Sequence, residues 1–299
     1  MKDLKINGII SAMITPMNED ESINVSALRE QVNRQIESGV HALFCFGTNG
    51  EGYILNKEEK KLVLETVIEE TNGRVPVYAG TGCVSTKETI EQSKMAMEIG
   101  ADALSIITPS FAMASQNELY EHYKAVAEKV DMPITLYNIP ARTGNVLTPE
   151  TVGRLSEIPN IVGAKDSSGN FTNILGYISA TEKNNFSILS GNDQLILWTL
   201  KAGGVGGIAG CANVYPHTMA SIYDCYMKGE WEKAKEYQDS IASFRGCFKY
   251  GNPNTVVKTA VALLGYNVGK CRAPFNQLPE EGIEALKKVL KENADKGMR

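Results

Sequence analysis

The sequence has no surplus of basic residues and no long apolar run. Its 299 residues contain 30 Lys and Arg against 35 Asp and Glu, which gives a formal net charge of −5. Binding to a phosphate backbone requires a basic surface, so we expect no nucleic-acid partner. No apolar stretch approaches the roughly 20 residues that a transmembrane helix needs, so we also expect no membrane partner. With 43% hydrophobic residues, the chain can still bury a large core.

Cysteine and histidine are scarce, and neither is spaced like the ligands of a metal. The six cysteines form no C-x-x-C pair, and the three histidines, His41, His122 and His217, are scattered. Zinc sites use clustered ligands, so we expect no metal. Met1–Gly8 lacks the apolar core of a signal peptide, and unpaired thiols suit a reducing compartment. We therefore expect a cytoplasmic protein.

Eight short apolar runs recur along the chain, and each is followed by a segment with helical periodicity. The runs are apolar on both faces, which is typical of parallel strands that are buried on both sides. Eight strand-plus-helix units predict an α/β protein with a (β/α)8 TIM-barrel fold. A doubly wound sheet would need a G-x-G-x-x-G turn after the first strand, and Ile14–Met17 is not such a turn. The expected strands are Gly8–Ile14, Ala42–Gly47, Val75–Gly80, Ala103–Thr108, Met132–Asn138, Ile161–Asp166, Phe186–Gly191 and Gly206–Gly210.

After the eighth strand the chain shows only helical patterns, which is more than one closing helix needs. The expected helices are Pro216–Lys228, Glu230–Lys249, Pro253–Leu264 and Pro279–Ala294. We therefore expect a catalytic barrel in residues 1–225 and a helical extension, packed on the barrel, in residues 226–299.

Lys165 lies at the end of the sixth expected strand, where a buried strand would normally avoid a charge. Strand alternation places Ile161, Gly163 and Lys165 on one face, and we expect Gly163 to leave space beneath the lysine. Inside a barrel the ammonium loses hydration, which favours the neutral amine. A neutral amine is the nucleophile that forms Schiff bases with carbonyl compounds. The alternative is a lysine that reaches solvent or pairs with Asp166.

Tyr137 ends the fifth expected strand in a similar position. Alternation places Thr135 and Tyr137 on one face, and this polar pair should point into the barrel. A phenol there can relay a proton. The alternative is a tyrosine at the rim that packs only through its ring.

Two further segments at strand ends suit a carboxylate. Thr48 and Asn49 lie between Gly47 and Gly50, so the backbone can approach a ligand closely and offer its N–H groups. Arg142 follows the fifth strand, and a guanidinium there can bind a second carboxylate. An ordinary tight turn and a solvated loop arginine are the alternative readings.

The glycine-rich segment Gly203–Gly210 is a weak candidate for phosphate binding. Loops after the seventh and eighth strands of many barrels bind phosphate. Most of this segment, however, precedes or lies within the strand itself.

Together these segments resemble the dihydrodipicolinate synthase/N-acetylneuraminate lyase family. The resemblance is carried by Gly47–Glu51, Tyr137–Gly144 and Gly163–Asp166, and it extends from about Gly8 to the C-terminal helices. It implies a pyruvate-dependent lyase of class I, with a TIM barrel and no cofactor beyond the covalent Schiff base. It also implies a homo-oligomer, either a dimer or a tetramer.

The resemblance assigns a role to each candidate residue. Lys165 would form the Schiff base with pyruvate, Tyr137 would shuttle protons, and Thr48 would position the Tyr137 hydroxyl. The remaining residues would bind substrate: Thr48, Asn49, Gly50 and Ile208 around pyruvate, and Arg142 at the carboxylate of the aldehyde partner. In the synthase branch that partner is aspartate semialdehyde.

Two positions depart from the synthase pattern. Asn49 stands where the synthases usually have a second threonine, and Phe111 stands where they usually have a tyrosine that is lent across a subunit interface. Synthase activity is therefore our first expectation. The second is an aldolase or dehydratase of the same family that acts on 2-keto-3-deoxy sugar acids or 4-hydroxy-2-oxoglutarate. A phosphosugar-binding barrel without Schiff-base chemistry and a keto-acid-binding regulator are further alternatives.

Overall fold

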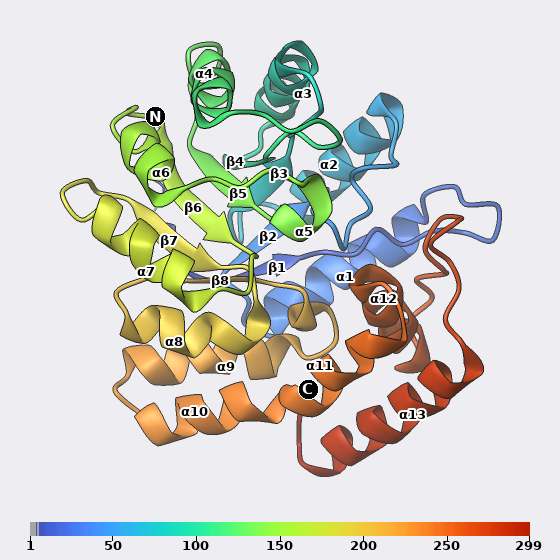
Figure 1. The fold of residues 1–299 in the computed structure, drawn as a ribbon. Helices are drawn as coiled ribbons and strands as arrows, with labels where there is room; N and C mark the ends of the chain where they lie inside the picture. The colour runs from blue at the N-terminus through green and yellow to red at the C-terminus, as the bar shows by residue number, and fades with distance from the viewer. Residues whose placement is uncertain (1–3, 5) are drawn as a thin grey trace. The chain divides into compact units, whose positions relative to one another are not determined.

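The structure is a computed structural model, and it describes residue 4 and residues 6–299. Eight parallel strands, in sequence order, form a closed barrel, which confirms the predicted fold class (Figure 1). Every predicted strand is present, most of them with slightly narrower bounds. The strands are β1 Gly8–Ala12, β2 Ala42–Cys45, β3 Val77–Gly80, β4 Ala103–Ile107, β5 Ile134–Asn138, β6 Ile161–Asp166, β7 Ser187–Ser190 and β8 Gly206–Ala209. Part of Met1–Gly8, the segment considered for a leader, lies outside the described residues (1–3 and 5).

The chain groups into two compact units. The first unit contains Pro76–Ile208 together with Gly8 and the described residues before it, and the second contains Ile9–Val75 and Ala209–Arg299. The domain boundary predicted after residue 225 falls inside a helix of the second unit, α9 (Pro216–Met227). The division into residues 1–225 and 226–299 stays a prediction.

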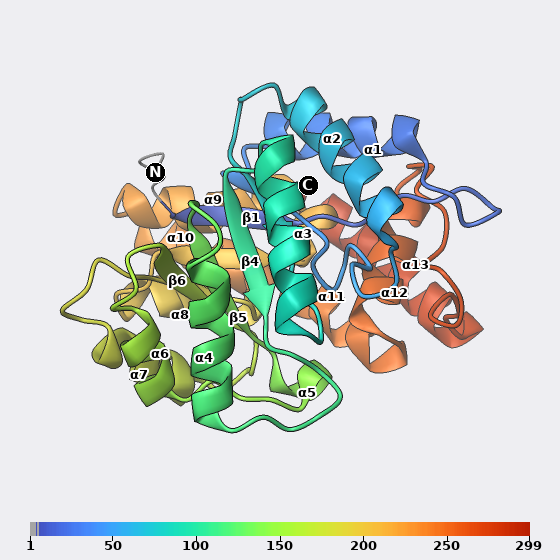
Figure 2. The ribbon, with the colours of Figure 1, turned by 90° about the horizontal axis from the view of Figure 1, so that it is seen from above.

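The first unit carries strands β3–β7, strand β8 up to Ile208, and the helices between β3 and β8. Its helices are α3 Thr86–Ile99, α4 Gln116–Ala127, α5 Pro140–Thr143, α6 Pro149–Leu155, α7 Phe171–Ala180 and α8 Ile196–Lys201. Figure 1 shows α3, α4, α6 and α7 outside the strands, and Figure 2 shows α3 and α4 side by side. Ser85 and Ser115 cap α3 and α4 by accepting the N–H of Glu88 and Glu118, which fixes where each helix begins.

The second unit carries β1, β2 and the helices at both ends of the chain. Its helices are α1 Val25–Glu37, α2 Lys57–Thr71, α9 Pro216–Met227, α10 Trp231–Ser240, α11 Ala242–Arg245, α12 Pro253–Leu263 and α13 Glu280–Asp295. Helices α1 and α2 lie side by side (Figure 2), joined by ion pairs from Arg29 to Glu69 and Glu70. In the part of the chain that the structure describes, no helix is both long enough and apolar enough to cross a membrane.

One predicted helix is broken. We expected a continuous helix over Glu230–Lys249, but α10 ends at Ser240 and is followed by the short α11 and a 3-10 helix, Gly246–Tyr250. The hydroxyl of Ser240 donates a hydrogen bond to the carbonyl of Tyr237, at 2.7 Å, and such local bonding competes with the helical pattern.

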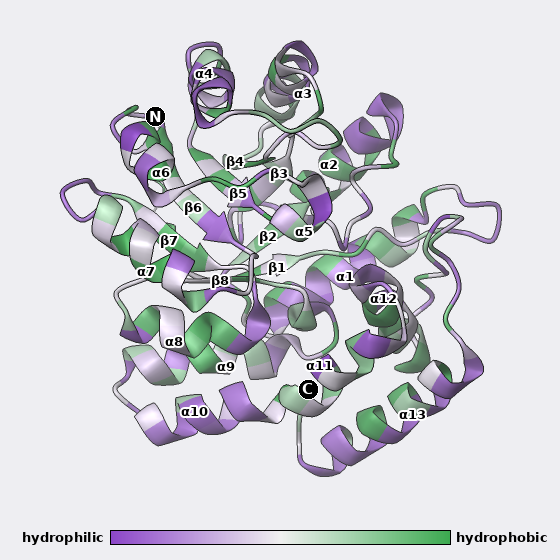
Figure 3. Ribbon diagram, viewed as in Figure 1, coloured by the Kyte–Doolittle hydropathy of each residue, from purple (hydrophilic) through white to green (hydrophobic). Residues whose placement is uncertain are grey.

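The strands are buried over almost their whole length, whereas the helices carry hydrophilic residues on their outer sides (Figure 3). The same view shows hydrophilic character at the carboxyl end of β6. That end of a parallel barrel is where active sites form.

Asn213 joins β1 to the segment after β8 within the second unit. Its side-chain oxygen accepts the N–H of Ile14 at 2.9 Å, and its amide donates to the carbonyls of Ala12 and Gly210. Asn213 is 1% exposed, so water cannot replace these partners.

We expect Asn213→Ala to lower the free energy of unfolding by about 2–4 kcal/mol, because several buried backbone groups lose their partners. Urea denaturation of the purified protein measures the change. The control is Asn18→Ala, which removes an exposed side chain that hydrogen-bonds within its own turn. A loss no larger than that of the control would contradict the role given to Asn213.

Candidate active site

Lys165 and Tyr137 lie next to each other at the carboxyl ends of two neighbouring strands. They face each other in the β5–β6 register, and the Lys165 Nζ lies 3.9 Å from the centroid of the Tyr137 ring. Each residue is 4% exposed. The structure therefore brings together, inside one unit, a buried amine and a phenol, the two groups that Schiff-base chemistry needs.

Asp166, the neighbour of Lys165 in sequence, is held on the other side of the strand. Its carboxylate accepts hydrogen bonds from the amide of Asn138 at 2.8 Å, from the amide of Asn173, and from both the N–H and the hydroxyl of Ser168. Alternation along β6 turns Asp166 away from Lys165, and these four bonds fix it there. The alternative in which Lys165 simply pairs with Asp166 is therefore not favoured by the geometry.

The space for the Lys165 side chain comes from Gly191 and not, as we expected, from Gly163. A Cβ atom on Gly191 would lie 2.7 Å from Cε of Lys165 and would collide with the hydroxyl of Ser167. A Cβ atom on Gly163 would instead meet the carbonyl oxygen of Ser187 at 2.7 Å. Gly163 thus allows β6 and β7 to approach, and the expectation that it leaves space beneath Lys165 is wrong. Gly191 was not among the residues predicted for the site, although Gly191 directly follows β7, the strand beside β6.

Arg142 and Ile208 belong to the same unit as Lys165 and Tyr137. Arg142 is exposed on the short helix α5, directly after β5. The hydroxyl of Thr108 donates to that of Thr143 at 2.8 Å, which ties α5 to the end of β4. Ile208 is 1% exposed in β8. Arg142 thus follows β5 and Ile208 lies within β8, while their roles as substrate-binding residues stay predictions.

Thr48, Asn49 and Gly50 belong to the second unit, in a loop with little freedom. A Cβ atom on Gly50 would lie 2.8 Å from the carbonyl oxygen of Met13, so only glycine fits there. The hydroxyl of Thr15 donates to the Gly50 carbonyl at 2.7 Å.

The residues that flank this loop have an uncommon backbone conformation. Phe46 and Glu51 have φ angles of 65° and 55°, which non-glycine residues seldom adopt. The side chain of Asn49 packs against Gly210, where a Cβ atom would lie 2.6 Å from its amide nitrogen. Such a strained and closely packed loop is typical of a functional site.

The glycine-rich segment around β8 has a structural explanation. Cβ atoms on Gly204 and Gly207 would lie 2.8 Å from the carbonyl of Ile188 and 2.6 Å from the side chain of Ile196. These glycines allow β8 to pack closely against its neighbours, so they do not require a phosphate.

Two of the three histidines, His41 and His122, make local contacts. His41 accepts the N–H of Ile9 and pairs with Asp224 at 3.1 Å, while His122 is bonded to Thr86 at 2.9 Å. Burial lowers the pKa of His122 to about 4, so it is neutral at physiological pH. Among residue 4 and residues 6–299, no group of three His, Cys, Asp or Glu side chains could hold a metal ion.

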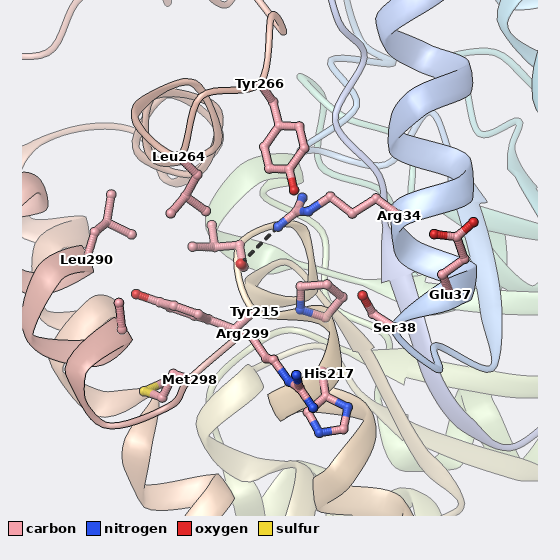
Figure 4. A pocket seen from close by; sticks show the side chains of 13 residues that line it. Arg34, Glu37, Ser38, Tyr215, His217, Leu264, Tyr266, Leu290, Met298 and Arg299 are labelled. Carbon is pink, nitrogen blue, oxygen red and sulfur yellow. Dashed lines mark hydrogen bonds between the residues drawn. The ribbon is translucent and has the colours of Figure 1, made fainter.

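The second unit also contains a cavity of about 470 Å³ that holds none of the predicted site residues (Figure 4). Arg34 projects into it beneath Tyr266, whose ring centroid lies 4.4 Å from the guanidinium carbon. The guanidinium donates to the carbonyls of Asn213 and Val214 at 2.7 and 3.0 Å. Arg34 therefore supports the segment after β8, and we assign no ligand to this cavity.

The chain is similar in sequence to known proteins of one family. The model of the dihydrodipicolinate synthetase family matches residues 5–293. A 4-hydroxy-tetrahydrodipicolinate synthase of Methanopyrus kandleri is 40% identical over 290 residues, which are 96% of each chain. One of Syntrophus aciditrophicus is 40% identical over 283 residues, 95% of this chain and 97% of that one.

Solved structures show the same similarity. The dihydrodipicolinate synthase of Acinetobacter baumannii, crystallised with pyruvate, superposes with a TM-score of 0.94 at 35% identity, covering 97% of this chain and 99% of that one. A prophage protein of E. coli K12 from the same family, also in complex with pyruvate, has a TM-score of 0.93 at 30% identity, covering 96% and 98%. The match to the family model and the relatives that align over nearly their whole length confirm the resemblance and the expected class of enzyme: the chain belongs to the dihydrodipicolinate synthase family of lyases.

Proposed function

We propose that the protein condenses pyruvate with aspartate semialdehyde, as a 4-hydroxy-tetrahydrodipicolinate synthase, through a Schiff base on Lys165. The observation that carries this proposal is the buried Lys165 amine beside the ring of Tyr137, at the carboxyl ends of adjacent strands. Membership of the family and relatives that bear this name support the choice of reaction.

In this proposal the amine of Lys165 attacks the keto carbon of pyruvate. The resulting carbinolamine loses its hydroxyl as water and leaves a protonated imine. The methyl group then releases a proton, and the enamine that forms attacks the aldehyde carbon of the second substrate. Tyr137 is the group in contact with Lys165 that can take up and return these protons.

We further propose that the loop of Thr48, Asn49 and Gly50 binds the pyruvate carboxylate through its backbone N–H groups. Thr48 would also orient the Tyr137 hydroxyl, and Ile208 would line the site with its carbonyl. The match to the family model over residues 5–293, which includes all of these residues, supports these roles. Arg142 would bind the carboxylate of the aldehyde, since a guanidinium matches a carboxylate in shape and charge.

A second candidate is an aldolase or dehydratase for 2-keto-3-deoxy sugar acids or 4-hydroxy-2-oxoglutarate. It shares the Schiff base and differs only in the partner. Phe111 favours it, because this residue is 99% exposed and has no hydroxyl with which to extend a proton relay. The substrate decides between the two candidates.

We also propose that the protein is a homo-oligomer, a dimer or a tetramer, in the cytoplasm. The exposure of Phe111 and Met113, at 99% and 77%, supports an oligomer, because burying two large apolar side chains against another subunit is favourable.

Borohydride reduction in the presence of pyruvate should add covalent mass at Lys165, and Lys165→Ala should abolish both the adduct and the activity. Mass spectrometry of the peptides locates the adduct. The control is Lys129→Ala, which changes an exposed lysine of the same unit. A wild-type protein without an adduct would contradict the proposal and favour a barrel that binds phosphosugars without covalent chemistry.

The second substrate is identified by a separate assay. It compares turnover with aspartate semialdehyde with turnover on the 2-keto-3-deoxy sugar acids and 4-hydroxy-2-oxoglutarate.

Tyr137→Phe should lower kcat by about two to four orders of magnitude, the usual contribution of a positioned general acid–base group. The ring remains, so the packing against Lys165 is retained. Steady-state kinetics measure the loss, and Tyr120→Phe, on the outer helix α4, is the control. Wild-type turnover in Tyr137→Phe would mean that Tyr137 acts only through its ring.

Gly191→Ala should slow imine formation by about 10- to 100-fold, because the new methyl group displaces the end of the Lys165 side chain. The rate of borohydride trapping at saturating pyruvate measures this step. Gly246→Ala is the control, since a Cβ atom there meets nothing within 4 Å. Equal trapping rates in the two variants would show that Lys165 tolerates the displacement.

A further inference from the structure

A buried ion pair lies directly beside the loop of Thr48, Asn49 and Gly50. Glu51, the next residue, is fully buried, and its Oε1 accepts a hydrogen bond from Nζ of Lys258 at 2.8 Å. Its Oε2 accepts the backbone N–H of Arg272, also at 2.8 Å. Lys258, in α12, is 1% exposed. Both oxygens of Glu51 are thus held by the C-terminal part of the second unit.

The buried ion pair of Glu51 and Lys258 is not expected to stabilise the folded state by itself. Removing two charges from water costs free energy that their attraction only partly returns, and two apolar side chains of similar volume would often be as stable or more so. A directional pair, however, fixes the position of the groups that it joins, which apolar contacts do less well.

The backbone of Glu51 adds to this cost. Its φ of 55° is unfavourable for a residue with a side chain, and such a conformation persists only where surrounding contacts enforce it. The bonds to Lys258 and Arg272 are contacts of this kind. Beside it, Gly52 packs so closely on the carbonyl of Phe46 that no side chain fits there.

The residues that follow Glu51 are held by the same part of the chain. The amide of Asn254 donates to the Tyr53 hydroxyl at 3.1 Å, and the Tyr53 ring packs edge-to-face on Phe275 at 5.5 Å. The guanidinium of Arg272 donates to the carbonyl of Ile54.

Arg272 also pairs with Glu59, at 2.7 Å between Nη2 and Oε1. The whole stretch from Glu51 to Glu59 is therefore attached to α12 and to the segment before α13.

We infer that Glu51 and Lys258 are positioning residues for the carboxylate-binding loop, and that the C-terminal extension holds this loop in its binding conformation. The inference rests on the proposed function of Thr48, Asn49 and Gly50. The inference predicts that loss of the pair weakens the binding of pyruvate and leaves the chemistry on Lys165 intact, because the pair supports the binding loop and includes neither Lys165 nor Tyr137.

A neighbouring thiol does not compete for Lys258. Burial, and next the charge of Glu51, raise the pKa of Cys271 to about 12, so this thiol remains neutral. The ammonium of Lys258 therefore has the Glu51 carboxylate, and not a thiolate, as its anionic partner.

The test compares Glu51→Gln, Lys258→Met and the double variant in the full-length protein. We expect each to raise the KM for pyruvate by about 10- to 100-fold, the scale of a binding group displaced by about 1 Å, with little change in kcat at saturation. The KM of the aldehyde should stay within about twofold of the wild-type value. The effect of the double variant should be smaller than the product of the two single effects, because both changes break the same contact.

The matched control is the pair Arg29 and Glu70, an ion pair of the same unit between α1 and α2. Arg29→Met and Glu70→Gln remove the same kinds of group at a distance from the loop. Thermal unfolding of all variants separates a general loss of stability from a specific loss of pyruvate binding, since the control variants should unfold earlier without any change in KM.

A folded Glu51→Gln with the wild-type KM for pyruvate would overturn the inference. If Glu51→Gln does not fold, Glu51→Asp provides the test, because this variant keeps the charge and moves the carboxylate by one methylene. An unchanged KM for pyruvate in Glu51→Asp would equally overturn the inference. Failure of the proposed function is a separate result, seen as a wild-type protein that forms no borohydride-trapped adduct.

Discussion

The proposed site depends on the register of β5 against β6, because this register places Lys165 beside Tyr137. Within β6, alternation places Lys165 and Asp166 on opposite sides of the strand. Asp166 is occupied by Asn138, Ser168 and Asn173. Lys165 is left against the ring of Tyr137, an arrangement that depends on the β5–β6 register, since a shift by one residue would send either side chain to the wrong face.

The features that could be predicted from the sequence are those that a local pattern records. Strands buried on both faces are continuous apolar runs, so all eight were recognised. Lys165 and Tyr137 were identified because each interrupts such a run near its end. The end of α10 at Ser240 could not be predicted, because the helical periodicity of the sequence continues beyond this residue. The hydrogen bond from the Ser240 hydroxyl to the Tyr237 carbonyl is not visible in that periodicity.

Other features depend on contacts between distant parts of the chain, and no local pattern records them. Gly191 matters because the absence of a side chain leaves space for a lysine of the neighbouring strand. Gly163, to which the sequence pattern assigns this purpose, instead allows two strands to approach each other. The pairing of Glu51 with Lys258 joins residues 207 positions apart. Sequence shows that both are charged, but it does not show that both are buried or that they meet.

The separation of 207 residues in sequence between Glu51 and Lys258 also determines when the two partners are made during synthesis. A ribosome adds roughly 5–20 residues per second, so Glu51 waits roughly 10–40 s for its partner to be made. The first unit ends at Ile208 in the sequence, so all of it is made before Lys258. The loop that we propose for pyruvate binding therefore gains this support only after every residue of the first unit, Lys165 among them, has been synthesised.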